Sequence, residues 1–160
     1  MKTVFLFLLL TTASIQSFAL ITNEHRVEDQ ITRSGRPALD ELRGFKTIID
    51  IETPGKAVSD EKKQAARLGI KFIASPLSVD YAPTNAQIYA LISQMKNKDN
   101  QPLLIHCFHG EDRTGLVVGL YRVFVSGWTP EQAYQEMLDN GFHPKFVSLK
   151  NYFFKRTKGK

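Results

Sequence analysis

Residues 103–121 read LLIHCFHGEDRTGLVVGLY, and this stretch decides the fold. Residues 103–105 are consecutive aliphatic residues, as in a short buried strand, and residues 116–120 are apolar on all sides, as in a central buried helix. The residues 106–115 join the two. In a largely parallel sheet, ligands bind at the carboxyl ends of the strands, so we expect the functional residues in this connecting loop.

The rest of the chain alternates between strand-like and helix-like segments. Besides residues 103–105, apolar runs predict strands at residues 47–51 and 70–74. Apolar periodicity and capping signals predict helices at residues 37–43, 59–68, 84–96, 130–140 and 147–155, and after residue 115. This alternation predicts a single α/β domain with a short central, mainly parallel sheet flanked by helices.

Several residues indicate where the helices begin and end. Thr84 and Thr129 are each followed three residues later by glutamine, which is the capping-box pattern of a helix start. Ser59 is expected to cap the helix over residues 59–68, and Gly69 to end it in a left-handed conformation. These signals predict short, defined helices between the strands.

Composition narrows the possible classes of protein. The chain has 160 residues, of which 42% are hydrophobic, as in an ordinary compact domain. Cys107 is its only cysteine, so no disulfide can form within the chain. The formal net charge of +5 is modest and partly reflects a basic C-terminal tail, so nucleic-acid binding is not expected. A positive field nevertheless raises the local concentration of an anionic substrate.

The N-terminus has the pattern of a secretory signal peptide. Lys2 precedes an apolar run and a stretch of small residues that ends with Ser17-Phe18-Ala19. We expect cleavage after Ala19, which assigns residues 1–19 to the signal peptide and residues 20–160 to the functional domain. The apolar run is too short and too polar at its end for a stable membrane anchor. The mature protein is therefore expected to be exported, either to the periplasm or outside the cell.

The loop between the predicted strand and helix combines a nucleophile with an anion-binding site. A short loop that opens into a helix can point successive backbone N–H groups at one centre, where the helix dipole adds positive charge. Gly110 permits a backbone conformation that other residues resist. Arg113 can present two parallel donors to the oxygens of a phosphoryl group. The same environment favours the thiolate form of Cys107.

The pattern Cys-x5-Arg, with His106 before it and Thr114 after it, resembles the signature of the cysteine-dependent phosphatases of the protein-tyrosine-phosphatase superfamily. The short chain is similar to the dual-specificity subclass. The resemblance implies that Cys107 attacks phosphorus to form a phosphocysteine, that Arg113 binds the phosphoryl group, and that Thr114 offers its hydroxyl to the sulfur. It implies that His106 holds the loop in place without touching the phosphate itself. The residues around the phosphate are Phe108, His109, Gly110, Glu111, Asp112 and Arg113.

Alkyl phosphates need a proton on the leaving oxygen, and the superfamily places an aspartate on a mobile loop before the cysteine. Asp80, in the segment Ser78-Val79-Asp80-Tyr81-Ala82-Pro83, is the matching residue and our candidate general acid. Asp112 is the competing candidate because it lies within the phosphate loop itself.

An upstream stretch gives a narrower resemblance. Residues 32–37 (TRSGRP), with residues 45–50 and 69–72, are similar to the opening of the atypical dual-specificity phosphatases, several of which act on inositol polyphosphates or pyrophosphates. The resemblance to small exported bacterial cysteine phytases makes an inositol polyphosphate the first substrate candidate. His109 and Glu111 stand where inositide-directed relatives often carry Lys or Arg. Four cations could add phosphate contacts: Arg33, Arg36, Lys56 and Lys71.

Several alternatives stay open. A protein tyrosine or dual-specificity phosphatase would share all of this chemistry. A rhodanese-like sulfurtransferase also uses a cysteine loop, although typically a shorter one, and a non-catalytic phosphate-binding module would need no nucleophile. His106, Cys107, His109 and His143 lack the spacing of a structural zinc site, and Arg113 would repel a cation, so neither a metal nor another cofactor is expected. The expected partner is a small anionic phosphorylated substrate, and the sequence does not indicate the oligomeric state.

Overall fold

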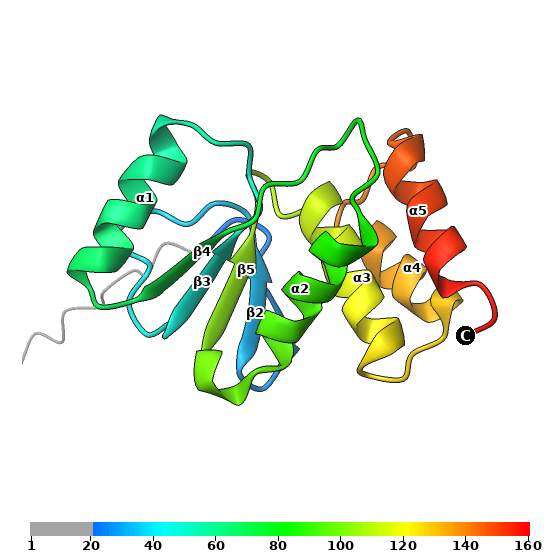
Figure 1. Ribbon diagram of the computed structural model, residues 1–160, viewed down its shortest axis with the longest axis horizontal. Helices are drawn as coiled ribbons and strands as arrows, with labels where there is room; N and C mark the ends of the chain where they lie inside the picture. The colour runs from blue at the N-terminus through cyan, green and yellow to red at the C-terminus, as the bar shows by residue number, and fades with distance from the viewer. Residues whose placement is uncertain (1–20) are drawn as a thin grey trace, which may run out of the picture.

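The computed structural model describes residues 21–160, which form one five-stranded sheet with helices on both faces (Figure 1). The order across the sheet is β1-β2-β5-β3-β4, and β1 alone runs antiparallel to its neighbour. The strands are β1 (His25–Glu28), β2 (Ile31–Ser34), β3 (Thr47–Asp50), β4 (Lys71–Ala74) and β5 (Leu103–His106). The predicted single α/β domain with a short, mainly parallel sheet is confirmed.

The helices divide unequally between the two faces of the sheet. Helix α1 lies alone on one side, whereas α2 to α5 gather on the other (Figure 1). The helices are α1 (Lys56–Arg67), α2 (Asn85–Lys96), α3 (Asp112–Phe124), α4 (Pro130–Asp139) and α5 (Val147–Thr157), with a short 3-10 helix η1 at Lys98–Asn100. Neither the length nor the apolar content of any helix in residues 21–160 suffices for a membrane crossing. The predicted signal peptide, residues 1–19, lies outside the described residues.

Alternation of side chains along the strands supplies a core for each face. Ile48 of β3 and Leu104 of β5 pack with Ala65 on the side of α1. Their neighbours Ile49 and Ile105 point the other way, into the larger core beneath α2 to α5. Strands that are buried on both faces are typical of parallel sheets. The same strands therefore hold both helical layers in place, through alternate residues.

Helix α3 is the central helix, as its apolar sequence predicts. Most of its residues are buried, and it packs against α4 and α5. The side chain of Met137 on α4 approaches the helix closely at Gly119, where an added Cβ would lie 2.6 Å from the Met137 sulfur. Glycine at this position permits that approach.

The strand register brings the carboxyl ends of the strands together. His106, the last residue of β5, lies beside Ser34 of β2 and Asp50 of β3. The N–H of Ile51, just beyond β3, donates to the carbonyl of His106 at 3.0 Å. The loops that follow these three strands therefore leave the sheet at one edge.

Most of the predicted helix signals are confirmed. Thr84 and Thr129 both form complete capping boxes at the starts of α2 and α4. Gly69 ends α1 with a φ of +71°, and the Ile70 N–H donates to the Ala65 carbonyl in the geometry of a Schellman motif. The turn chemistry of these residues was sufficient to locate the helix ends.

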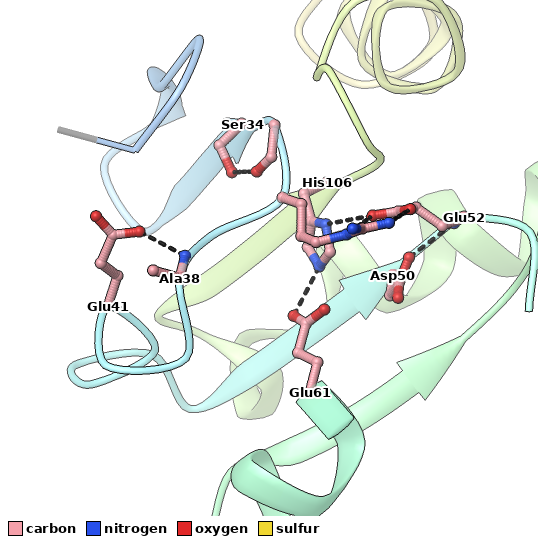
Figure 2. Close-up of polar contacts among 9 residues, drawn as sticks. Ser34, Ala38, Glu41, Asp50, Glu52, Glu61 and His106 are labelled. Carbon is pink, nitrogen blue, oxygen red and sulfur yellow. Dashed lines mark hydrogen bonds and ion pairs between the residues drawn. The ribbon is translucent and has the colours of Figure 1, made fainter. Parts of the chain in front are cut away.

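Two local predictions are wrong, and one pair of strands was missed. Residues 37–43 form turns rather than a helix: the Glu41 N–H bonds back to the Ala38 carbonyl, and the Glu41 carboxylate accepts from the Ala38 N–H at 2.6 Å (Figure 2). Ser59 does not cap α1, which begins at Lys56 after Gly55. The hairpin of β1 and β2 was not predicted, because these strands lack a clear alternation of polar and apolar residues.

Candidate active site

Cys107 is the first residue after β5, and it is 2% exposed at the base of a cavity of about 280 Å³. The loop that follows it reaches Asp112, where α3 begins. The cavity brings the predicted nucleophile together with Arg113. Its lining residues are Val79, Cys107, Phe108, His109, Asp112, Arg113 and Phe146.

The carbonyl groups of the loop are held on its outer side. The Phe108 carbonyl accepts from the Arg36 N–H at 3.0 Å, the His109 carbonyl accepts from the Asn23 amide at 3.4 Å, and the Gly110 carbonyl accepts from the Arg33 guanidinium. In a trans peptide the C=O and the next N–H point in opposite directions. The N–H groups of residues 109–111 therefore point away from these partners, and within residues 21–160 they find no acceptor.

Gly110 makes this loop conformation possible. Its φ is +76°, in the left-handed region that favours glycine. A Cβ added at Gly110 would lie 2.5 Å from the backbone nitrogen of Gly35 and 2.5 Å from the carbonyl carbon of Ser34. Since both are backbone atoms at the end of β2, the loop could not accept a side chain without moving away from the sheet.

Helix α3 places Arg113 and Thr114 in its first turn, directly after the loop. Arg113 lines the cavity, whereas Thr114 is fully buried, and its hydroxyl has no hydrogen-bond partner among the described residues. The positive end of the α3 dipole and the free N–H groups of the loop both favour an anion in this cavity.

His106 is buried behind the cysteine, on the side of the sheet that α1 covers. Its Nε2 lies 2.9 Å from Glu61 of α1, and its Nδ1 lies 4.0 Å from Glu52 (Figure 2). Glu52 in turn accepts two hydrogen bonds from the Arg36 guanidinium. Burial opposes the imidazolium charge, but the hydrogen bond to Glu61 and the nearby carboxylates raise the pKa of His106 above its usual value.

Asp50 completes this buried cluster (Figure 2). Its Oδ1 accepts from the Glu52 N–H at 2.7 Å, and its other oxygen is buried without a partner among the described residues. Burial raises the pKa of Asp50 to about 6, against a smaller opposing effect of His106. The sequence analysis named His106 but not its carboxylate partners, because Glu61 is distant in the sequence and lies on a helix.

The two candidate acids occupy different environments. Asp80 is exposed on the loop before α2, where its N–H donates to the Ser78 hydroxyl at 3.0 Å, and the preceding residue, Val79, lines the cavity. Asp112 lines the cavity itself. Its carboxylate accepts from the His143 N–H at 2.7 Å, and the His143 ring lies 3.1 Å away.

The four cations named as possible extra phosphate contacts do not line this cavity. Arg33 is buried beneath the loop, and Arg36 is paired with Glu52. Lys56 pairs with Asp60 on α1, and Lys71 bonds to the Asn100 side chain at 2.9 Å. Sequence reasoning instead missed Phe146 and Val79, which contribute apolar walls and carry no recognisable motif.

Within residues 21–160, two groups of side chains have ligand atoms close enough for a metal ion. Within each group the ligand atoms lie within 4.8 Å of one another. The first group is the buried cluster of Asp50, Glu61 and His106, and the second is Glu111, Asp112 and His143. Hydrogen bonds within each group account for much of this proximity. The cysteine itself belongs to neither group.

The architecture and the loop geometry agree with what comparison with known proteins shows. The family model described as "DSP-PTPase phosphatase fused to NAD+ Kinase" matches residues 22–153. The chain belongs to this family. The match covers all five strands and the whole phosphate loop, and it ends within α5.

Two curated relatives are similar over most of this chain. The dual specificity protein phosphatase TpbA of Pseudomonas aeruginosa is 27% identical over 126 residues, which are 75% of this chain and 55% of the relative. The inositol diphosphatase DSP5 of Arabidopsis thaliana is 28% identical over 123 residues, which are 71% of this chain and 59% of the relative. The chain thus spans somewhat more than half the length of the curated relatives it matches.

Solved structures share the fold. The core catalytic domain of the PP-IP phosphatase SIW14 from S. cerevisiae superimposes with a TM-score of 0.72 at 22% identity, covering 89% of this chain and 92% of that one. P. aeruginosa TpbA superimposes with a TM-score of 0.71 at 22% identity, covering 84% of each chain. These likenesses confirm the dual-specificity-phosphatase-like fold.

Proposed function

We propose that this protein is a phosphomonoester hydrolase that works through a phosphocysteine intermediate. The observation that carries the proposal is the cavity lined by both Cys107 and Arg113, at a loop in which the carbonyls of residues 108–110 are hydrogen-bonded on the outer side. Inward N–H groups, a guanidinium and a helix N-terminus together suit a tetrahedral oxyanion. The family membership supports the same chemistry.

In the proposed reaction, the Cys107 thiolate attacks phosphorus opposite the leaving oxygen. The S–P bond forms as the P–O bond breaks, and the leaving oxygen takes a proton from a general acid. Water then attacks the phosphocysteine, gives its proton to the same carboxylate, and releases orthophosphate and the thiolate. Arg113 and the loop N–H groups stabilise the charge on the phosphoryl oxygens throughout. We assign to Thr114, whose buried hydroxyl has no hydrogen-bond partner among the described residues, the stabilisation of the sulfur as it leaves.

We assign the general acid to Asp80. Its side chain is exposed, while its neighbour Val79 already lines the cavity, so a small movement of this loop brings the carboxyl to the leaving oxygen. Asp112 is less free to reach a leaving group, because its Oδ1 is already hydrogen-bonded to the His143 N–H. Asp80→Asn should therefore slow alkyl phosphates far more than an activated aryl phosphate.

The cavity wall favours an aromatic phosphomonoester such as phosphotyrosine. Phe108, Phe146 and Val79 supply apolar surface around the single guanidinium of Arg113. Phe108 is 48% exposed and stands at the rim, where an aryl group could pack against it. The printed name of TpbA, a dual specificity protein phosphatase, is consistent with this substrate class.

Inositol polyphosphates, the first candidate from sequence, become the second candidate. The names of DSP5 and SIW14 support them. Among the described residues, two cations stand near the cavity wall: Lys145, whose Nζ lies 5.5 Å from the Phe146 ring, and Arg36, whose guanidinium lies 4.7 Å from the Phe108 ring but is paired with Glu52. His109 also lines the cavity. The other three candidate cations are engaged elsewhere, as described above. A polyphosphate would therefore find few additional charges beside Arg113.

The test is phosphate release from a phosphotyrosyl peptide, a phosphoseryl peptide and inositol hexakisphosphate, each with wild type and Cys107→Ser. We expect release from the phosphotyrosyl peptide by wild type, no turnover by Cys107→Ser, and no inhibition by chelators. Full activity of Cys107→Ser would refute the mechanism. Faster turnover of inositol hexakisphosphate than of both peptides would reverse the order of the substrates.

We also propose that the protein is exported and that cleavage after Ala19 yields the mature chain. The support is the sequence pattern of residues 1–19. N-terminal sequencing of the protein recovered from outside the cytoplasm of a bacterial host tests this. A mature chain that begins at Leu20 agrees with the proposal, and an intact N-terminus contradicts it.

A further inference from the structure

Arg33 of β2 is a buried guanidinium to which the reaction described above gives no role. Its side chain is 1% exposed. One nitrogen, Nη2, donates to the Gly110 carbonyl. The other two nitrogens, Nε and Nη1, are buried and have no hydrogen-bond partner among residues 21–160. A buried cation with so few partners destabilises the fold, so its presence calls for a compensating role.

The surroundings of Arg33 place its charge directly beneath the phosphate loop. A Cβ built on Gly115, in the first turn of α3, would lie 4.0 Å from Nη2. The charged groups that act on the guanidinium are Glu136 of α4, Arg122 of α3 and the Cys107 sulfur. Burial lowers the pKa of Arg33 to about 10, so the guanidinium keeps its charge at neutral pH.

The hydrogen bond from Arg33 also fixes the direction of one peptide group. The Gly110 carbonyl and the Glu111 N–H belong to the same planar unit and point in opposite directions. Because Arg33 holds the carbonyl on the outer side of the loop, the Glu111 N–H is turned toward the anion. Gly110 has the backbone freedom to lose this orientation if the bond is removed, since its φ is already +76°.

We propose that Arg33 is a positioning residue of the active site: by holding the Gly110 carbonyl, it aims the Glu111 N–H at the bound phosphate. This rests on the proposed function insofar as the bound anion is a phosphate. Arg33 touches neither substrate nor leaving group, so it acts through the loop. A purely structural Arg33 would instead contribute to folding alone.

Alkylation of Cys107 separates these two roles without relying on turnover. Cys107 is the only cysteine in the chain, so the rate of its reaction with iodoacetamide as a function of pH reports the thiolate directly. Protection from alkylation by added inorganic phosphate reports the anion site. Both are measured for wild type, Arg33→Met and Arg33→Lys.

The matched control is Arg122→Met. Arg122 is 8% exposed and also buried on this side of the sheet, but it bonds to Glu136 and to the Val27 carbonyl rather than to the loop. Replacing Arg122 therefore lowers stability by removing a buried arginine, but it does not alter the hydrogen bonds of the loop. Urea unfolding of every variant shows how much of each effect is structural.

We expect Arg33→Met to need about tenfold more phosphate for the same protection. This factor corresponds to the free energy of one charge-assisted hydrogen bond. Arg33→Lys should restore only part of the protection, because an ammonium group does not reproduce the planar geometry of the guanidinium. Arg122→Met should match wild type in protection by phosphate, because Arg122 does not bond to the loop.

Wild-type protection by phosphate in folded Arg33→Met would overturn the proposal. If Arg33→Met does not fold, Arg33→Lys decides: protection equal to wild type overturns the proposal, and reduced protection with the same rate of alkylation as wild type in the absence of phosphate supports it. Failure of the proposed function looks different. In that case wild type releases no phosphate from any substrate, while the alkylation and protection experiments still report on Arg33.

Discussion

Replacing Asp50 with asparagine should stabilise the protein at neutral pH and much less in acid. Asp50 is 1% exposed, and burial raises its pKa from 3.8 to about 6. Between these two values the native state holds a proton that the unfolded chain has lost, so the stability contributed by this group falls as the pH rises. A shift of this size corresponds to about 3 kcal/mol, at 1.36 kcal/mol for each pH unit.

Asparagine keeps the shape of Asp50 and the acceptor for the Glu52 N–H, but it never carries the buried charge. Roughly half of this 3 kcal/mol loss of stability occurs between pH 5.0 and 7.5. Asp50→Asn should therefore gain about 1.4 kcal/mol relative to wild type when the pH is raised over that interval. The raised pKa of His106 lowers the stability of both proteins as the pH rises, because the stability that a protonated His106 contributes is lost when it deprotonates.

The assay is urea unfolding followed by the fluorescence of Trp128, the only tryptophan, which stacks against Arg122 at 4.4 Å. Unfolding is measured for wild type, Asp50→Asn and the control Asp40→Asn, whose side chain is exposed. The control should parallel wild type at every pH. If Asp50→Asn also parallels wild type from pH 5.0 to 7.5, the buried carboxyl is not linked to stability and the electrostatic account of this cluster is wrong.

Three further substitutions test other parts of the structure. Gly110→Ala should lower kcat/KM by at least about tenfold, because the new Cβ meets the β2 backbone at 2.5 Å; activity equal to wild type would contradict the loop geometry. Thr84→Ala should cost about 1 kcal/mol of unfolding free energy in urea, through loss of the α2 cap, with unchanged kcat. Phe146→Ala should raise KM several-fold for a phosphotyrosyl peptide and little for inositol hexakisphosphate. Equal effects on both substrates would show that Phe146 does not select between them.

The sequence was most informative where one local rule decides the conformation. The aliphatic residues of β5, the all-apolar face of α3 and the capping boxes at Thr84 and Thr129 each predicted their element correctly. The helix expected over residues 37–43 failed, because the carboxylate of Glu41 satisfies the Ala38 N–H locally and closes a turn instead. The amino-acid composition of residues 37–43 suits a helix and a turn equally well, so it did not distinguish between them.

The site was predictable only in its contiguous part. The residues from Cys107 to Arg113 follow one another, so their spacing already indicates an anion-binding loop. The outer hydrogen bonds come from Asn23, Arg33 and Arg36, which are more than seventy positions away in the sequence. No local pattern links them to the loop, and the parallel pairing of β2 with β5 is what brings them together. This pairing also places the Arg33 side chain, which the sequence suggested only as a possible phosphate contact, in the interior.

The contact of Glu61 with His106 ties the cysteine loop to α1, on the opposite side of the sheet from α3. Cys107 is therefore supported by both helical layers at once. If α1 detached while the rest of the domain stayed folded, His106 would lose its ion-pair partner and the loop would lose its support from that side. Partial opening on either side should thus abolish the proposed phosphatase activity before global unfolding, so that loss of turnover becomes the earliest sign of damage by heat or denaturant.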